Sequence, residues 1–573
     1  MPAAPDRIAS AVDQVAEDHL LQVARLDPVA ATVMGMSGYD AEMTDLSPDG
    51  VAARADVARA TLRTLDATIA APGTVLDDVD RVTVAALRER LGLEVELADA
   101  GETLAPLNVI ASPVQDLREV FDVAPQGTVD AWQDVAARLA AIPAALDGYA
   151  ESLRLAASRG SLSALRQVRA VAQQARDEAD PRTGSLHALV RGEALERVHD
   201  DSAPCAALRR DLEAGARDAA EAYGRLAGVL DELAPQAPEH DGVGDERYAL
   251  WSRYFLGARV DLRETYEWGL EELERVAAEQ TRTAERVAGP GASVADAVAT
   301  LDADPAYRLE GTEALRRWMQ ETSDAAIDAL DGVHFDIPEP LRLLECRIAP
   351  TQTGGIYYTG PSDDFSRPGR MWWSVPASVT TFSTWQERTT VYHEGVPGHH
   401  LQVGQAVHER ATLNTWRRLA CWTSGHAEGW ALYAERLMAD LGFLDDPGDL
   451  LGMLDGQRLR AVRVVIDIGV HLGLPCPQRW GGGTWDAEKA WHVLRTNVTM
   501  PEDSARFELD RYLGWPGQAP SYKVGQRLWE QARDGARDAA AASGRAFDLK
   551  DFHARALALG SVGLDVLREE LAR

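Results

Sequence analysis

The stretch TTVYHEGVPGHHLQ, residues 389–402, contains three histidines and a glutamate around a Pro-Gly step. Its His393-Glu394 pair begins like the motif H-E-x-x-H, in which two histidines on one face of a helix hold a metal ion. That motif would have its second histidine at position 397, which is proline in this chain. The fold around residues 389–402 therefore depends on how the chain brings a second imidazole back to His393.

A regular helix cannot do this, because each residue advances by about 100° and 1.5 Å. His399 comes six residues after His393 and would point to the opposite face of the helix. His400 comes seven residues after it and would lie about 10.5 Å along the helix axis. Neither histidine could share an ion with His393 in an undisturbed helix.

Pro397 changes this geometry. It has no N–H for the carbonyl of His393 and its ring clashes there, so the helix must bulge or break. Gly398 then supplies a conformation that is closed to other residues. A bulge of two extra residues would return His399 to the usual place of the second histidine, and such interruptions often mark functional sites. We therefore predict a metal site; the alternative is a kinked helix with three surface histidines.

A zinc ion held by two imidazoles needs a third ligand and an open position for water. The segment CWTSGHAEGWALYAERLMAD, residues 421–440, has the pattern of a following helix and offers Glu428. Glu428 stands beside Gly429, where another backbone can approach closely. Glu435, seven residues later, either supports the ligands or is a solvated charge, and His426 is a rival ligand. The expected zinc ligands are His393, His399 and Glu428.

The chain around this site has the pattern of a mostly α-helical protein. Residues 1–235 show apolar positions three and four apart, segment after segment. The Pro-, Gly- and Asp-rich stretch 234–249 is the expected boundary to a second region, residues 236–573. The short runs LRLLECRIAP, GGIYYTG and RMWWSVP predict a small β-sheet. We expect a large helical body, in one or two lobes, with this sheet beside the helix pair of the site.

The composition limits the class of protein. With 573 residues, 46% hydrophobic and 26% charged, the chain is expected to be globular with a large core. A net charge of −32 argues against nucleic-acid and anionic-membrane partners. The four cysteines form no C-x-x-C pair, no segment has the length of a membrane span, and the first residues lack an apolar signal core. These features predict a soluble, cytoplasmic protein with reduced thiols.

The sequence H-E-G-V-P-G-H-H-L-Q, followed by E-G-W-A-L-Y-A-E, resembles the bacterial domain-of-unknown-function 885 family, regarded as zincin-like metallopeptidases. The similarity continues in RLRAVRVVIDIGVHLGL, in ELDRYLGWPGQAPSYKVG and, more weakly, in GIYYTGPSDDFSRPGRMWW. It covers most of the chain from about residue 240. The resemblance implies a mostly helical fold with a small sheet beside the metal, and peptide-bond hydrolysis. It favours His399 over His400 as ligand, whereas His426 departs from the apolar or aromatic residues common at that position.

The expected roles follow from the chemistry of zinc hydrolysis. Glu394, next to the first ligand, is the expected general base and then general acid. His471 and Tyr522 resemble the oxyanion donors of other helical zinc peptidases, although each could be a hydrogen-bonded core residue. Arg511 could hold a substrate carboxylate in a bidentate pair. It could equally pair with Glu508, three residues earlier.

Three hypotheses for the function follow. The first is a zinc-dependent hydrolase that cleaves peptide bonds in short peptides, as a dipeptidase or carboxypeptidase does. The second is a metal-dependent hydrolase of another amide or ester. The third is a catalytically silent binding protein, which the presence of both His393 and Glu394 argues against. The sequence leaves open the substrate length, the choice between exo- and endopeptidase action, and the oligomeric state.

Overall fold

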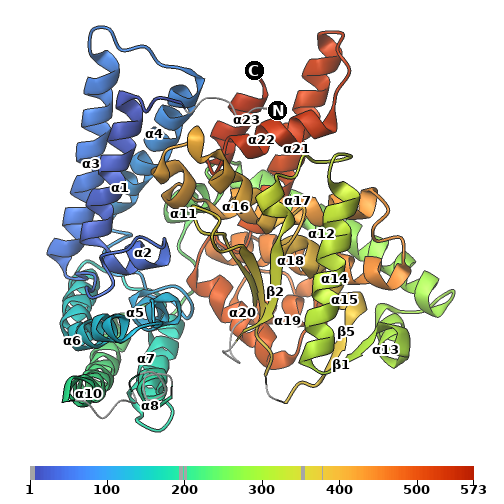
Figure 1. The fold of residues 1–573 in the computed structure, drawn as a ribbon. Helices are drawn as coiled ribbons and strands as arrows, with labels where there is room; N and C mark the ends of the chain where they lie inside the picture. Colours follow the sequence, from blue (N-terminus) through green and yellow to red (C-terminus); the bar gives the residue numbers. More distant parts are fainter. Residues whose placement is uncertain (1–6, 193–197, 199–202, 350–354, 377) are drawn as a thin grey trace.

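The protein is mostly helical, as predicted, with two small β-sheets (Figure 1). The computed structural model describes residues 7–192, 198, 203–349, 355–376 and 378–573. The N-terminal helices stand at the left of Figure 1, and the C-terminal body with both sheets lies beside them. Within the described part of the chain, no helix combines the length and the apolar composition that crossing a membrane requires.

The N-terminal helices begin where side chains cap them. The Ser10 hydroxyl accepts hydrogen bonds from the N–H groups of Val12 and Asp13, and the Asp13 carboxylate accepts one from Ser10, so that a capping box starts the first helix. The helices of this region are α1 (Ala11–Leu26), α2 (Pro28–Val33), α3 (Pro48–Ala70), α4 (Asp78–Asp99), α5 (Pro113–Val123), α6 (Val129–Ser158), α7 (Leu165–Ala179), α8 (Ser185–Arg191) and α10 (Ala203–Leu233).

Two hydrophobic cores divide these N-terminal helices. Helices α6, α7 and α10 enclose one core, which includes Trp132 and Leu212. Helices α1, α3 and α4 belong instead to the large core of the C-terminal body, through residues such as Leu87. The division into regions 1–235 and 236–573 stays a prediction.

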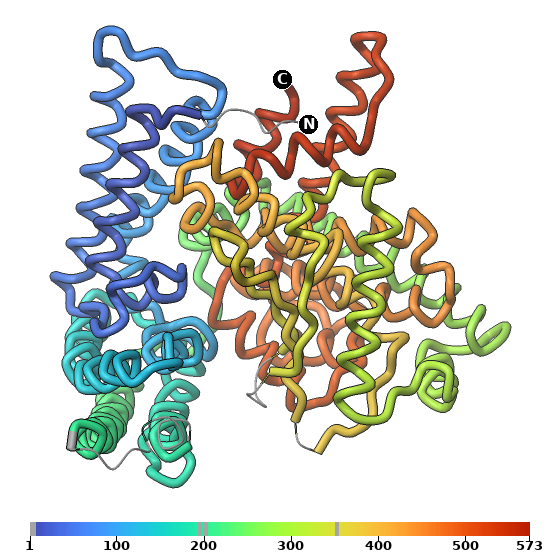
Figure 2. Tube along the Cα trace, viewed as in Figure 1, coloured from blue at the N-terminus to red at the C-terminus, as the bar shows by residue number. Residues whose placement is uncertain are grey.

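The C-terminal body contains the remaining elements. Its α-helices are α11 (Asp245–Leu256), α12 (Leu262–Ala288), α13 (Val294–Ala303), α14 (Thr312–Leu330), α15 (Thr384–Glu394), α16 (His399–His408), α17 (Ser424–Asp440), α18 (Pro447–His471), α19 (Ala487–Asn497), α20 (Glu502–Gly514), α21 (Ser521–Ala542), α22 (Leu549–Ala558) and α23 (Leu564–Leu571). Figure 2 shows the last helices, in red, returning toward α4, which α23 contacts.

The predicted sheet is formed by β2 (Leu344–Ile348), β4 (Gly369–Trp373) and β3 (Ile356–Thr359), in that spatial order. Strand β2 runs parallel to β4, and β3 runs antiparallel to it. Residues 350 and 354, at the ends of two of the predicted runs, lie outside the described residues. A second sheet, not predicted, pairs β1 (Arg308–Glu310) with β5 (Thr381–Ser383).

The three-stranded sheet packs beside the predicted site. Its buried face meets α14 and α15 in a core that contains Met319, Met371 and Val391. Strand β3 pairs with β4 on one side only, so that β3 forms an edge of the sheet. This arrangement confirms the predicted small sheet in a helical body.

Helices α17 and α21 cross closely, and this crossing positions the site residues that they carry. A Cβ atom added to Gly429 would overlap the backbone of Gly525, and one added to Gly525 would overlap the carbonyl oxygen of Gly425. Glycine is therefore required on both helices at this crossing. The backbone approach predicted at Gly429 is confirmed, and it brings Glu428 of α17 close to the start of α21.

Candidate metal centre

The chain leaves the helix completely between the histidines. Helix α15 ends at Glu394 and α16 begins at His399, so the predicted two-residue bulge is a full break. Within the break, the N–H of Gly398 donates to the carbonyl of Tyr392 at 3.1 Å, and the Val396–Pro397 peptide bond is cis. The break brings His399 back to His393. The centroids of the two imidazole rings lie 4.8 Å apart.

A missing side chain and a hydrogen bond stabilise this break. Gly398 has a φ of −74°, so it uses no left-handed conformation; its role is steric, because a Cβ atom there would overlap the carbonyl oxygen of His393. The buried indole of Trp430 donates from Nε1 to the carbonyl of Pro397 at 2.8 Å. The break therefore depends on a contact from α17 as well as on the local sequence.

The break, together with α17, gathers a possible set of metal ligands. His393, His399 and Glu428 each offer one ligand atom, and these atoms lie within 4.8 Å of one another. Oε2 of Glu428 is 3.3 Å from Nε2 of His393 and 3.5 Å from Nε2 of His399. These are the three residues that the sequence predicts as ligands.

His400 lies apart from this group. Its Nδ1 is 2.9 Å from the hydroxyl of Tyr358, and its Nε2 is 2.9 Å from the carbonyl oxygen of Leu341. Burial lowers the pKa of His400 to about 4, so the ring is neutral. Of the two adjacent histidines, His399 is therefore the one that faces His393.

The three residues fit a divalent metal ion. Oε2 of Glu428 is buried and accepts no hydrogen bond from any described residue, which is costly for a carboxylate unless a cation satisfies it. Two imidazole nitrogens and one ionised carboxylate form the donor set of many zinc hydrolases.

A buried carboxylate orients the first ligand. Oε1 of Glu435 is 2.7 Å from Nδ1 of His393, and its Oε2 accepts a hydrogen bond of 2.7 Å from the hydroxyl of Thr389. Because a carboxylate can only accept, Nδ1 carries the hydrogen and Nε2 faces Glu428. Glu435 is 2% exposed, so it supports the site and is not a solvated charge.

His426 is not part of the cluster. Its Nδ1 lies 3.2 Å from the side-chain amide of Gln402, and its ring packs against Trp529. Burial lowers the pKa of His426 to about 3. The structure therefore leaves Glu428 without the rival that the sequence suggested.

The ligands open into a cavity of about 350 Å³. Glu394 also lines this cavity, with Oε1 4.0 Å from Nε2 of His393, and burial raises the pKa of its carboxyl. Tyr522, at the start of α21, lines the cavity too, and the guanidinium of Arg463 lies 4.9 Å from the centre of its ring. The other residues that line the cavity are Ile356, Tyr357, Tyr358, Val403, Trp422, Ala427 and Arg460.

Two predicted site residues lie elsewhere. His471 is 1% exposed, with Nε2 2.9 Å from the carbonyl oxygen of Tyr512, and it does not line the cavity. Arg511 donates to Glu508 at 3.1 Å and to Gln518 at 2.6 Å. The structure therefore does not bring His471 or Arg511 to the metal ligands. Both take the alternative that the sequence left open, a hydrogen-bonded core residue for His471 and a pair with Glu508 for Arg511.

The sequence profile of a family described as "Bacterial protein of unknown function (DUF885)" matches residues 28–571. The chain belongs to this family. No curated protein matches the DUF885 chain. Two solved structures share its fold. A candidate lipoprotein from Colwellia psychrerythraea has a TM-score of 0.82 at 21% identity, over 98% of this chain and 99% of its own. A candidate lipoprotein of unknown function from Shewanella oneidensis has a TM-score of 0.73 at 16% identity, over 99% and 100%.

Sequence reasoning missed two cations in the cavity of this DUF885 protein, Arg460 and Arg463 of α18. Arg463 donates to the carboxylate of Glu508 at 2.8 Å and to the hydroxyl of Tyr512 at 2.9 Å. Arg460 donates to the carbonyl of Gly456 at 3.3 Å, and no carboxylate of the described residues lies within 4.0 Å of its nitrogens. The available signal was the segment RLRAVR, which puts three arginines into a helix rich in apolar residues.

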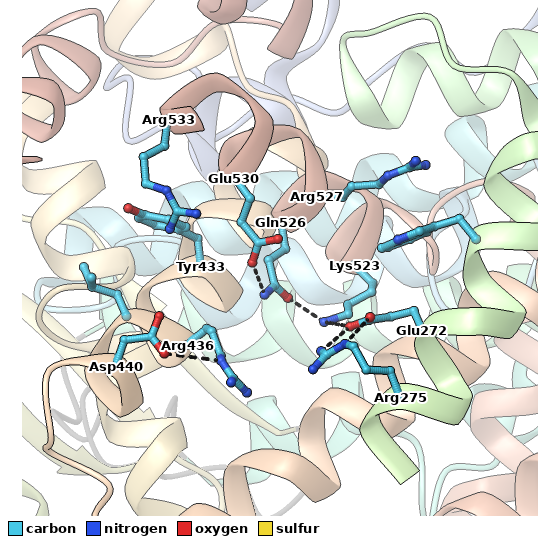
Figure 3. A pocket seen from close by; sticks show the side chains of 12 residues that line it. Glu272, Arg275, Tyr433, Arg436, Asp440, Lys523, Gln526, Arg527, Glu530 and Arg533 are labelled. Atoms are coloured by element: carbon cyan, nitrogen blue, oxygen red, sulfur yellow. Dashed lines mark hydrogen bonds and ion pairs between the residues drawn. The ribbon is translucent and has the colours of Figure 1, made fainter. Parts of the chain in front are cut away.

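A polar network of Glu272, Arg275, Lys523 and Gln526 connects α12 to the start of α21 (Figure 3). Lys523 is 2% exposed, and its Nζ lies 2.9 Å from Oε1 of Glu272 and 2.9 Å from Oε1 of Gln526. Arg275 donates to the same Glu272 at 2.7 Å. Because Lys523 follows Tyr522 directly, this network between α12 and α21 holds Tyr522 at the edge of the cavity.

The steric account of the break predicts the effect of a single methyl group. Gly398→Ala should lower the free energy of unfolding by about 2 kcal/mol or more, because the new Cβ would overlap the His393 carbonyl. Gly92→Ala is the matched control: Gly92 lies within α4 with no neighbouring atom within 4 Å of an added Cβ, so the change should stabilise the protein by up to about 1 kcal/mol. Chemical denaturation measures both; equal stability of the two variants would contradict the account.

Proposed function

We propose that the protein is a zinc-dependent hydrolase that cleaves peptide bonds in short peptides. The observation that carries the proposal is the group of His393, His399 and Glu428, with a cavity on its open side and Glu394 in the wall of that cavity. A site of three protein ligands with an open position is the arrangement of catalytic zinc, whereas structural zinc sites are closed by four ligands.

Each residue near the ligands has a role in such a reaction. When bound, zinc lowers the pKa of a water molecule to about 7 and polarises the carbonyl of the scissile bond. Glu394, whose buried carboxyl lies 4.0 Å from Nε2 of His393, would accept a proton from a water molecule at the metal position and would return it to the leaving amine. The hydroxyl of Tyr522 would donate a hydrogen bond to the oxyanion. Glu435 keeps Nε2 of His393 directed at the metal position.

Arg460 takes the substrate-binding role that Arg511 does not fill. An arginine without a carboxylate partner among the described residues, in the wall of a cavity of a chain with net charge −32, is a strong attractor for an anionic group. The C-terminal carboxylate of a peptide is the anion that fits peptide hydrolysis. This supports dipeptidase or carboxypeptidase action over internal cleavage.

We propose separately that the protein is located in the cytoplasm. Cys205, Cys346, Cys421 and Cys476 are buried and unpaired, as expected of reduced thiols.

The proposed ligand set predicts one zinc ion per chain. His399→Ala and Glu428→Ala should each lose most of the bound zinc, because two remaining ligands hold the ion weakly. His408→Ala, on the exposed face of the same helix α16, is the matched control and should retain full zinc content. Elemental analysis of purified protein measures all three. Full zinc content in the Glu428 variant would remove that residue from the ligand set.

The role of Glu394 predicts a separation of activity from metal binding. Glu394→Gln should reduce peptide turnover by about 10²–10⁴-fold while the zinc content stays at one per chain, because a base and not a ligand is lost. Turnover of a peptide mixture is followed by mass spectrometry, with chelator-treated enzyme as the blank. If the variant lost its zinc, or hydrolysed peptides at nearly the parent rate, Glu394 would not be the base.

The role of Arg460 predicts a loss of discrimination between peptide acids and amides. The parent enzyme should prefer a peptide with a free C-terminal carboxylate, and Arg460→Gln should lower kcat/KM for that peptide by about 10- to 100-fold, with little effect on its C-terminal amide. Arg458→Gln is the control: Arg458 lies on the same helix, donates to Asn497 and Gln280, and does not line the cavity. An unchanged ratio of acid to amide hydrolysis in the Arg460 variant would contradict the assignment.

A further inference from the structure

A larger cavity of about 760 Å³ lies between the N-terminal helices and the C-terminal body. Helices α5, α7, α8 and α10 form one wall. Tyr357 of β3 and Phe507 of α20 form the other. We call this cavity the interlobe cleft. It contains none of the metal ligands.

The interlobe cleft meets the metal cavity at one residue. Tyr357 lines both cavities, and its ring stacks on Trp372 with centroids 6.2 Å apart and planes at 16°. Tyr357 lies on the edge strand β3 and is 39% exposed. A ligand that passes this tyrosine would therefore extend from the metal ligands to the N-terminal helices. The metal cavity alone, at about 350 Å³, is at the small end for ligand sites.

The interlobe cleft carries net negative charge, whereas the positive and negative side chains in the metal cavity balance. The lining of the interlobe cleft includes four carboxylates, those of Glu119, Asp122, Asp177 and Glu178, and one cation, Arg118, which gives a net −3 (1 − 4). Arg118 is already paired with Glu119 at 2.7 Å and Asp122 at 3.3 Å. The wall of the metal cavity has two cations, Arg460 and Arg463, and two carboxylates, Glu394 and Glu428.

Apolar surface accompanies the acidic groups. Phe507 is 44% exposed and Val123, across the cleft, is 54% exposed. Burial, together with the charge of the nearby Asp122, raises the pKa of the Tyr357 phenol. Asp122 of α5 therefore lies near the point where the two cavities meet.

We propose that the interlobe cleft binds the N-terminal part of a substrate peptide longer than a dipeptide. It would select peptides that combine basic side chains and a free α-amino group with apolar side chains. The proposal rests on the proposed peptide hydrolysis. With the C-terminal carboxylate at Arg460 and the scissile bond at the metal ligands, the preceding residues run past Tyr357. They then meet a wall of net negative charge with exposed apolar side chains, which is complementary to a cationic, apolar segment.

Binding to zinc-loaded Glu394→Gln protein tests this, because the variant should not consume its ligand. Isothermal titration compares the hexapeptide Lys-Leu-Lys-Leu-Ala-Ala with Glu-Leu-Glu-Leu-Ala-Ala and with the dipeptide Ala-Ala. The lysine peptide should bind at least about tenfold more tightly than the glutamate peptide. The added substitutions Asp122→Asn and Asp177→Asn should reduce that ratio by about fivefold or more. The matched control, Asp66→Asn with Asp99→Asn, removes two exposed carboxylates of α3 and α4 that do not line the cleft, and should leave the ratio unchanged.

A second variant provides a test if the Asp122→Asn, Asp177→Asn protein does not fold. Phe507→Ala truncates an exposed side chain and should weaken both hexapeptides while the dipeptide is unaffected. Equal binding of the lysine and glutamate hexapeptides, or a ratio that survives the cleft substitutions, would overturn the proposal. The test separates the two levels. If the lysine peptide is preferred but the parent enzyme hydrolyses no peptide, the proposed function is rejected and the cleft remains a peptide-binding site. If the parent enzyme hydrolyses peptides without this preference, the proposed function stands and the role of the cleft is rejected.

Discussion

The hydrogen bond from Trp430 to the carbonyl of Pro397 joins the two halves of the site. Without the break at Pro397 and Gly398, His399 would point away from His393. Six residues of regular helix turn the chain by one full turn and about 240° more, so the two side chains would lie on different faces. The local sequence removes the helix, since Pro397 has no N–H and Gly398 has no Cβ to meet the His393 carbonyl. The contact with Trp430 then ties the broken backbone to α17.

Helix α17 supplies three different groups to this one place. Glu428 faces the two imidazoles, Trp430 holds the break, and Glu435 orients His393. A shift of α17 would therefore disturb the third ligand, the path of the chain and the direction of the first ligand together. The glycines at its crossing with α21 keep α17 close to Tyr522, and the ion pair of Lys523 with Glu272 keeps α21 in register with α12. The candidate ligands and the groups that orient them therefore belong to the same few helices.

Much of this could be predicted from the sequence where short-range geometry decides. The helical class, the small sheet and the grouping of His393, His399 and Glu428 follow from apolar periodicity and from what a proline does to a helix. The detailed role of Gly398 could not be predicted, because its close neighbour is a carbonyl oxygen five residues earlier and not its own torsion angle. The contact from Trp430 joins segments that are 33 residues apart and needed the structure.

The positions of His471 and Arg511 away from the metal ligands have the same origin. Each lies in a segment that resembles the family, but its orientation is set by partners elsewhere, the Tyr512 carbonyl for one and Gln518 with Glu508 for the other. Arg460 was missed for the converse reason. In sequence it is one arginine among many, and only the packed structure shows it in a cavity wall with no carboxylate of the described residues within 4.0 Å of its nitrogens.

The most direct measurement is a crystal structure of the zinc-loaded protein with anomalous diffraction recorded on both sides of the zinc absorption edge. The account predicts one strong anomalous peak per chain, about 2.0–2.2 Å from Nε2 of His393, Nε2 of His399 and a carboxylate oxygen of Glu428, with the remaining position facing the cavity. A peak coordinated by His400 or His426, or no peak at the break between α15 and α16, would contradict it.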